Sequence, residues 1–184
     1  MRTSFVRNLL AIAIALASLL APVSGAVPAR INRAVELLAS GQPVYYDQVS
    51  GGGYAEGRQM AGTWADYITY DLEHSPFDMT ALRGFMRGLV DAGTTRSGHR
   101  SPAVVVVLPV PGLSGDVVRA NAWMVEQVLG AGAHGALLVH ARDPEAVRAF
   151  VQAARYPHAP PAAGIGEGLR GAGGESYAAR TWGV

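Results

Sequence analysis

Two residue types that often supply covalent or metal chemistry are missing from this 184-residue chain. Cysteine is absent, which excludes disulfides, thiolate nucleophiles and cysteine-ligated metal sites. Lysine is absent as well, so the 15 residues counted as lysine or arginine are all arginines. The chain therefore cannot form a Schiff base through a lysine. Chemistry that needs an electron sink would have to use another group, such as a metal ion.

Charge is also scarce. Only 16% of the residues are charged and the formal net charge is +1, which gives no reason to expect nucleic acid or an anionic membrane as a partner. Hydrophobic residues make up 49% of the chain. This length and composition are typical of one globular domain with its own core.

The N-terminus has the layout of a secretory signal peptide. It combines a basic start, an apolar core, a helix breaker and small residues at a cleavage site: Arg2 and Arg7, residues 9–20, Pro22, and Ser24-Gly25-Ala26. The apolar core is short for a membrane span. We therefore predict that residues 1–26 are removed and that the domain 27–184 is exported, to the periplasm or outside the cell, with no stable membrane span after cleavage. The alternative is an uncleaved N-terminal anchor.

Short apolar runs and amphipathic stretches alternate along the mature chain. The apolar runs predict four strands, over residues 43–49, 65–72, 103–108 and 136–140. Four helices are predicted between and after them: a short one over residues 54–62, one with the stripe Met79, Leu82, Met86 and Leu89, one with the face Val118, Ala122, Val125 and Leu129, and one that faces inward through Val147, Phe150, Val151 and Ala154. Ser75 or Asp78 can cap the second helix, and Asp143-Pro144-Glu145 opens the last.

Four consecutive βα units predict a parallel sheet with right-handed crossovers. Both a (β/α)8 barrel and a doubly wound open sheet fit this pattern. The pattern stops after Arg155, where residues 156–184 become rich in proline, glycine and alanine. We therefore predict an α/β fold that is an incomplete TIM barrel of about four units, with two free sheet edges and an exposed apolar inner face.

Functional groups gather at the carboxyl ends of strands in both architectures. The second strand ends with Asp71, Glu73 and His74, three ionisable groups within four residues. His74 could act as a general base, with a carboxylate that orients its other ring nitrogen. In the alternative interpretation the two acids only bond loop amides and His74 is a surface residue.

The fourth strand ends at His140, which could line a site, and Arg142, which could bind a substrate carboxylate. Alternatively, Arg142 pairs with Asp143 or Glu145 at the surface and His140 packs at the rim. Tyr46, near the end of the first strand, could wall a pocket, although tyrosines on strands usually serve packing.

The remaining histidines and one glycine motif are interpreted as structural. His134 precedes the fourth strand at the opposite rim, and His99 and His158 lie in loops where we expect them to be solvated. Residues 166–171 match G-x-G-x-x-G formally. The motif follows a proline-rich loop and not a strand, so it predicts a flexible glycine loop, which could bind phosphate or carboxylate, and not a dinucleotide site.

Four segments resemble, in order along the chain, motifs of the HpcH/HpaI aldolase/citrate lyase family. They are residues 71–76 (the family's D-G-E-H-x-P), 128–138 (L-x-x-G-x-x-G), 153–157 (A-x-R-Y-P), and 168–171 with 178–183 (R-G-x-G and A-R-x-x-x-W). The matches extend from about Asn32 to the C-terminus. Their shared order makes the resemblance more specific than any single motif.

This resemblance implies a (β/α)8 barrel that cleaves or forms carbon–carbon bonds through a pyruvate-type enolate held on Mg²⁺, Mn²⁺ or Co²⁺. It makes His74 the acid/base residue, Asp71 its partner and Glu73 a support for the loop. The family's arginine at the end of strand three has no counterpart in residues 107–111, so its role passes to His140 or Arg142. The family's metal-binding Glu and Asp come from strands five and six, beyond residue 184, so no metal ligand is assigned in this chain.

Our first hypothesis is therefore a metal-dependent aldolase or carbon–carbon lyase that acts on 2-oxo acids such as pyruvate, represented by a fragment. The second is a non-catalytic or truncated barrel protein, such as an exported binder of small carboxylates. A different α/β enzyme on an open sheet is the third. Members of the family tend to form oligomers, so a homo-oligomer is one partner to consider.

Overall fold

The computed structural model describes residues 30–182 of the chain. The predicted signal peptide, residues 1–26, lies outside these described residues, as do residues 183–184. In the described part, no helix is both long enough and apolar enough to cross a membrane.

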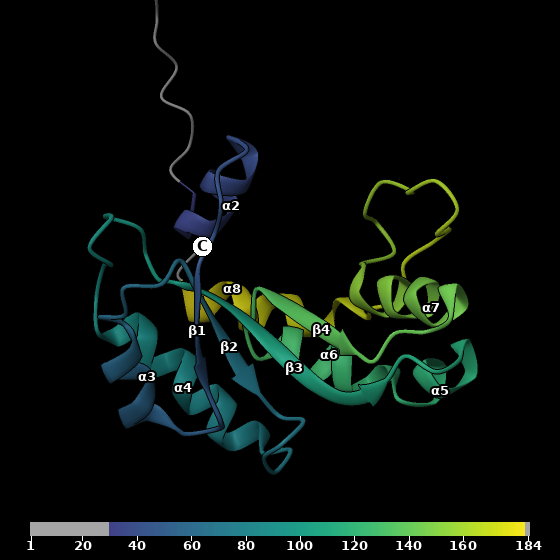
Figure 1. Ribbon diagram of the computed structural model, residues 1–184, viewed down its shortest axis with the longest axis horizontal. Coiled ribbons are helices and arrows are strands. Elements are labelled where there is room, and N and C mark those ends of the chain that lie inside the picture. Colours follow the sequence, from purple (N-terminus) through teal and green to yellow (C-terminus); the bar gives the residue numbers. More distant parts are fainter. Residues whose placement is uncertain (1–29, 183–184) are drawn as a thin grey trace, which may run out of the picture.

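Four parallel strands form one sheet (Figure 1). They are β1 (Tyr46–Val49), β2 (Tyr67–Asp71), β3 (Ala103–Pro111) and β4 (Gly135–Val139), and they lie in the order β1-β2-β3-β4. This order has no reversal, whereas a doubly wound sheet reverses at its switch point. The predicted α/β fold with a parallel four-stranded sheet is confirmed, and it is consistent with part of a (β/α)8 barrel.

At least one helix follows each strand, as the hydrophobic periodicity predicted, while the helices before the first strand and near the C-terminus were not predicted. The helices are α2 (Arg33–Ala39), α3 (Tyr54–Met60), α4 (Met79–Asp91), α5 (Gly115–Ala120), α6 (Ala122–Gly130), α7 (Pro144–Ala154), the short 3-10 helix η1 (Ala172–Gly174) and α8 (Glu175–Trp182). Figure 1 shows α3 and α4 side by side next to β1 and β2, and α5 next to α7.

The core lies between the sheet and the helices. Alternate residues of β2 and β3 are fully buried, among them Ile68, Tyr70, Val104, Val106 and Leu108. They meet the stripe of α4, Leu82, Phe85, Met86 and Leu89, which is also fully buried. Glycines bring α3 onto α4, because a Cβ at Gly57 would lie 2.1 Å from the carbonyl oxygen of Phe85. The second predicted helix and its stripe are therefore confirmed.

The opposite face of the sheet is much less covered. Val105 and Val107 are half-buried, and Leu137 on β4 is 41% exposed. Within the described residues, β1 and β4 each pair with one neighbouring strand only. The expected exposed apolar face and free edges are therefore present.

Two local predictions differ from the structure. The helical face from Val118 to Leu129 is divided between α5 and α6 at Asn121, whose side-chain amide donates to the carbonyl of Val117 (2.9 Å). The cap of α4 agrees with one of the two predicted candidates, since Asp78, and not Ser75, accepts the amides of Thr80 and Ala81.

The inward face of α7 was misplaced in part. Asp143 caps this helix and Pro144 occupies its first turn, as predicted. Its fully buried residues are Ala146, Ala149 and Ala153, while Val147 is exposed; Phe150 and Ala154 are half-buried and pack against the core, as predicted. Small side chains face the core there because α5 packs closely against α7.

Candidate functional site at the carboxyl ends of the strands

Asp71, the last residue of β2, organises the loop that follows the strand. Its side chain is buried, and its Oδ1 accepts the backbone N–H groups of Glu73 (2.8 Å) and His74 (3.1 Å). The hydroxyl of Ser75 donates to the Asp71 carbonyl. One carboxylate therefore holds the whole turn in place and sets the position of the His74 side chain.

His74 is bound to the second oxygen of the same carboxylate. Its Nδ1 donates to Oδ2 of Asp71 at 2.9 Å. The histidine side chain is 72% exposed while that of Asp71 is 5% exposed. Since Nδ1 carries the proton in this contact, the neutral imidazole has its lone pair on Nε2. An exposed base atom oriented by a buried carboxylate is the geometry of a general base.

The two groups change each other's acidity. The hydrogen bond from His74 to Asp71, helped by the negative charges of Asp71 and Glu73, raises the pKa of His74 above 6.5. Burial alone would favour protonated Asp71, but the hydrogen bonds from the ring and amide of His74 and the amide of Glu73 lower the pKa of Asp71 below its usual 3.8. Asp71 therefore stays ionised when His74 takes up a proton.

Gln48 on β1 is part of this site, although sequence reasoning missed it. Its side-chain amide donates to Oδ2 of Asp71 at 3.2 Å. Gln48 pairs in register with Thr69, two residues before Asp71, so parallel alignment of the first two predicted strands could have found it. With this contact, both oxygens of Asp71 accept two hydrogen bonds.

Glu73 connects the ends of β2 and β4 across β3. Its Oε1 accepts a hydrogen bond from Nε2 of His140 at 2.9 Å, and its Oε2 lies 3.9 Å from Nδ1 of His74. His140 directly follows β4 with a φ of 50°, the left-handed region that costs energy for a residue with a Cβ. The structure thus brings together four predicted site residues: Asp71, Glu73, His74 and His140.

Arg142 lies at the same edge, beside an open depression that it lines with Ala141, Asp143, Pro144 and Val147. Its predicted alternative partners are otherwise engaged. Asp143 caps α7 and accepts the amide of Gly115, and Glu145 pairs with Arg148. The Arg142 guanidinium makes no ion pair within residues 30–182, so it is available to a carboxylate.

Tyr46 does not join this cluster, which corrects its prediction as a pocket wall. It begins β1 and pairs in register with Tyr67, the first residue of β2, at the opposite end of the strand from Asp71. Its ring packs on Tyr67 with centroids 5.5 Å apart. The predicted first strand began three residues too early, which placed Tyr46 close to the wrong end.

The third strand offers no arginine, and it runs further than predicted. β3 continues to Pro111, and its register with β4 shifts between Val107 and Pro111. Pro109 and Pro111 have no N–H to donate, which explains why regular pairing stops there. The end of β3 therefore lies between the ends of β2 and β4 and contributes no charged side chain to this edge.

The other histidines lie elsewhere. His134 is buried, its Nδ1 accepts the amide of Val104 at 3.0 Å, and burial lowers its pKa to about 4, so its structural interpretation holds. His158 is exposed and stacks on Tyr156. The prediction for His99 is wrong, because its side chain is only 13% exposed and bonds Glu36 and Ser97.

The glycine loop of residues 166–171 is fastened to the end of α7. The amides of Leu169 and Arg170 donate to the carbonyls of Gln152 and Arg155. A Cβ at Gly168 would lie 2.2 Å from the carbonyl oxygen of Arg155. That glycine is required by close backbone packing, which contradicts the interpretation of a loosely held loop.

The described side chains at this edge do not fit a divalent metal. Both oxygens of Asp71 and one of Glu73 are already bonded within the cluster. Across the described part of the chain, no group of three or more His, Cys, Asp or Glu side chains is arranged to hold a metal ion. The groups present are an exposed imidazole held by a carboxylate and an arginine without an ion pair in the described residues.

Comparison with known proteins gives one informative result. No protein-family model matches this chain, and no curated protein matches it. Among solved structures it is similar to an HpcH/HpaI aldolase/citrate lyase family protein from Burkholderia cenocepacia, with a TM-score of 0.60 and 22% sequence identity. The match covers 81% of this chain and 52% of that one, so this chain spans about half the length of its structural relative.

At this identity the likeness shows the fold. The solved structure carries the family description that the four sequence motifs indicated independently. The suspected resemblance is therefore confirmed: this chain has the fold of part of an HpcH/HpaI aldolase/citrate lyase family protein.

Proposed function

We propose that the carboxyl edge of this sheet is the acid–base part of an aldolase or carbon–carbon lyase site that acts on small 2-oxo acids such as pyruvate. The observation that supports the proposal most is the Asp71–His74 pair, in which an exposed imidazole is oriented by a buried carboxylate. Likeness in fold to an aldolase/citrate lyase family protein gives this proton-transfer pair its reaction class.

In the proposed step, Nε2 of neutral His74 takes a proton from the carbon next to the 2-oxo group. The substrate becomes an enolate and the imidazole becomes an imidazolium. The charge of Asp71 stabilises that imidazolium through the 2.9 Å hydrogen bond. In the reverse direction the protonated His74 returns the proton to carbon. Such proton transfer contributes about 10²–10⁴-fold to the rate.

Arg142 is our candidate for the substrate carboxylate. It lies two residues after His140, which Glu73 connects to His74, and it lines the open depression at this edge. A guanidinium binds a carboxylate through two parallel hydrogen bonds. This arrangement would hold the acid end of a 2-oxo acid while His74 meets the carbon that loses its proton.

Metal dependence also belongs to the proposal, on the resemblance alone. A divalent ion would supply Lewis-acid stabilisation of the enolate oxygen. The described residues do not fit such an ion, so the proposed proton transfer uses only the side chains of this chain. Pyruvate exchange measured with and without EDTA decides whether the activity needs one.

The test is deuterium exchange of the methyl protons of pyruvate in D₂O, followed by NMR, with wild type, His74→Ala and His158→Ala. His158 is an exposed histidine outside the site and serves as the matched control. We expect exchange in wild type and in His158→Ala, and its loss in His74→Ala. Equal exchange in all three proteins would remove His74 from its role.

A second candidate is a binder of small carboxylates that performs no chemistry. The exposed Arg142 and its open depression favour it, since they need no base. Saturable pyruvate binding that Arg142→Gln abolishes, without any methyl exchange, would support this candidate against the first.

A further inference from the structure

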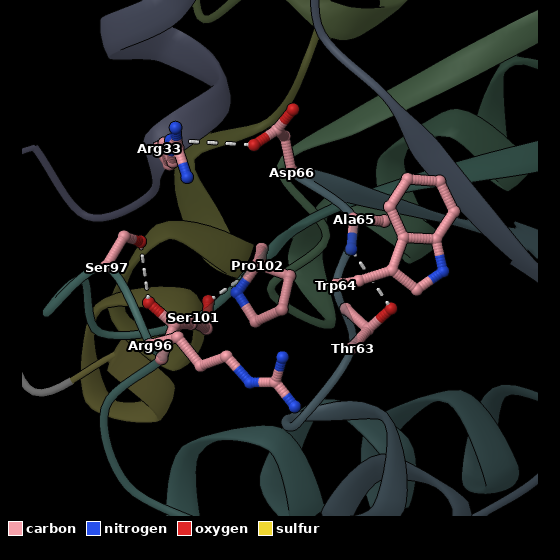
Figure 2. Close-up of a pocket in the computed structure, with 10 residues that line it drawn as sticks. Arg33, Thr63, Trp64, Ala65, Asp66, Arg96, Ser97, Ser101 and Pro102 are labelled. Atoms are coloured by element: carbon pink, nitrogen blue, oxygen red, sulfur yellow. Dashed lines mark hydrogen bonds and ion pairs between the residues drawn. The ribbon is translucent and has the colours of Figure 1, made fainter.

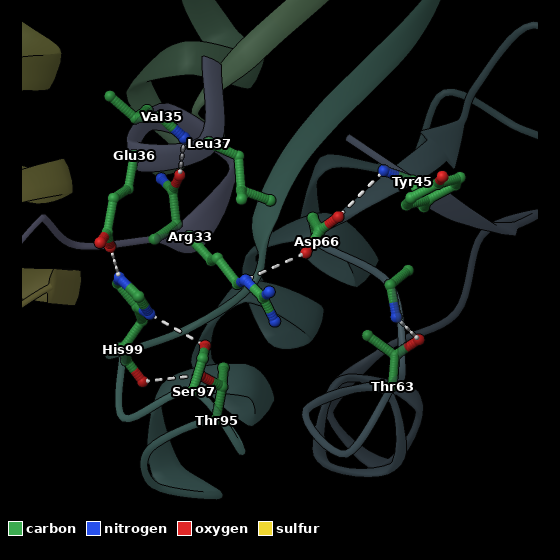
Figure 3. A network of polar contacts seen from close by, with 12 residues as sticks. Arg33, Val35, Glu36, Leu37, Tyr45, Thr63, Asp66, Thr95, Ser97 and His99 are labelled. Atoms are coloured by element: carbon green, nitrogen blue, oxygen red, sulfur yellow. Dashed lines mark hydrogen bonds and ion pairs between the residues drawn. The ribbon is translucent and has the colours of Figure 1, made fainter. Parts of the chain in front are cut away.

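A second polar cluster lies at the other end of the strands and takes no part in the site just described (Figure 3). Glu36 comes from α2, and Ser97 and His99 come from the loop between α4 and β3. Oε2 of Glu36 lies 2.7 Å from Nε2 of His99, and Oγ of Ser97 lies 2.9 Å from Nδ1 of the same ring. Three side chains thus form one chain of hydrogen bonds.

The carboxylate determines the direction of these hydrogen bonds. Glu36 can only accept, so Nε2 of His99 carries the proton. In the neutral ring Nδ1 is then the acceptor, and the Ser97 hydroxyl donates to it. A hydroxyl that donates to an imidazole, which is itself oriented by a carboxylate, is the arrangement that activates a serine nucleophile. The two ring nitrogens are exchanged relative to the Ser-His-Asp template, but either nitrogen can accept a proton.

The accessibility of the three groups suits these roles. Ser97 is exposed, whereas the His99 side chain is only 13% exposed and is shielded by the loop and α2. Thr95 fixes the loop, since its hydroxyl contacts Ser97 Oγ at 3.0 Å and its amide donates to the carbonyl of His99 at 2.8 Å. The nucleophile therefore faces solvent while its base is held behind it.

Ser97 also lines a cavity of about 150 Å³, large enough for a small acyl group (Figure 2). Two arginines line the same cavity. Arg33 pairs with Asp66 at 3.6 Å, while Arg96 makes no ion pair within the described residues. Trp64, at the same cavity, is 67% exposed. The cavity therefore combines a nucleophile, an available cation and an apolar surface.

We propose that Ser97, His99 and Glu36 form a second catalytic site, which hydrolyses small esters whose acyl part carries a negative charge. Ser97 Oγ bonds to the carbonyl carbon as its proton passes to Nδ1 of His99. The bond from that carbon to the alcohol oxygen breaks, and the alcohol leaves with the proton. Water then attacks the acyl-serine, His99 transfers the proton of the water to Ser97, and the carboxylic acid is released.

The four side chains have different roles in the proposed hydrolysis. Ser97 and His99 are catalytic residues, Glu36 is a positioning residue that acts through His99, and Arg96 attracts the anionic acyl group. The preference for a negative charge follows from the cavity, where Arg33 and Asp66 neutralise each other and Arg96 leaves an excess positive charge.

The test compares hydrolysis of 4-nitrophenyl acetate with that of 4-nitrophenyl hydrogen succinate, which adds a carboxylate to the acyl part. A fluorophosphonate probe with mass mapping identifies the modified residue. We expect the probe on Ser97, a higher kcat/KM for the succinate ester, and a loss of about 100-fold in Ser97→Ala and His99→Gln. Arg96→Gln should remove the preference for the succinate ester but keep the probe reaction.

Ser101→Ala is the matched control, since Ser101 lines the same cavity but its hydroxyl donates to the Pro102 carbonyl and not to a histidine. It should keep full activity, as should His74→Ala, which separates this site from the proposed lyase site. Glu36→Asp should retain more activity than Glu36→Gln at equal melting temperature. A probe attached elsewhere, or hydrolysis unchanged in folded Ser97→Ala, would overturn the proposal.

Discussion

The two ends of the sheet use the same pair of side-chain types in opposite ways. At the carboxyl end, His74 is 72% exposed and its partner Asp71 is buried. At the amino end, His99 is 13% exposed and its partner Glu36 is 62% exposed. The exposed member of a pair is the one that can meet a ligand. His74 can therefore act directly on a substrate, whereas His99 can act only through Ser97.

The buried member decides what each pair contributes to stability. Asp71 accepts two backbone amides and two side-chain donors, so its carboxylate replaces the water that a buried charge would need. Glu36 stays in water and accepts one hydrogen bond from His99. The carboxyl-end pair is thus part of the fold, while the amino-end pair is an attachment between α2 and a loop.

We expect the largest loss of stability when Asp71, the buried carboxylate, is removed. Asp71→Ala leaves the amides of Glu73 and His74 without their acceptor, and we expect it to lower the free energy of unfolding by about 4 kcal/mol, since each unsatisfied amide costs about 1–3 kcal/mol. Glu36→Ala should cost less than about 1 kcal/mol, as exposed ion pairs do. Urea unfolding of both variants measures the difference, and equal losses would contradict the contrast.

Much of this architecture was predictable because it depends on local periodicity. The continuous apolar run of β3 and the stripe of α4 need only neighbouring residues to be recognised, and both are confirmed. The grouping of Asp71, Glu73 and His74 at a strand end follows from the same reasoning. His140 could be placed at the same edge because parallel strands end together.

What could not be predicted depends on contacts between distant segments. His99 was assigned to solvent because its own loop is polar, yet Glu36, which lies 63 residues earlier, covers it. Tyr46 was misplaced by a strand boundary, and Val147 by the packing of α5 against α7, a helix whose fully buried residues are alanines. In each case the decisive partner is not visible in the local sequence.

A second histidine near the amino ends of the strands, His134, differs from His99 because it is buried without a carboxylate partner. Burial lowers its pKa from 6.5 to about 4. As the pH falls, His134 is therefore protonated in the unfolded chain before it is protonated in the folded one. This contribution to the free energy of unfolding is complete above pH 6.5 and decreases by about 3 kcal/mol as the pH falls to about 4. His134→Gln should flatten this part of the acid profile in urea unfolding. An unchanged slope in that variant would contradict the assignment.

The smallest effect concerns the backbone of His140, whose side chain contacts Glu73 and so connects the ends of β2 and β4. His140 has a φ of 50°, which glycine adopts freely and alanine does not. His140→Gly and His140→Ala both remove the contact with Glu73 and differ only in the Cβ. The glycine variant should be more stable by about 1 kcal/mol in thermal unfolding. An alanine variant of equal or greater stability would show that this conformation carries no strain.

The central claim, that Asp71 tunes His74 as a base at the carboxyl end, is tested most directly by the pH dependence of pyruvate methyl exchange. Neutral His74 is the reactive form, and its pKa lies above 6.5. We predict that the rate rises with pH through that raised pKa in wild type, and that in Asp71→Asn the rising limb moves to lower pH with a lower maximum. A limb at the same pH in a folded Asp71→Asn variant would contradict the account.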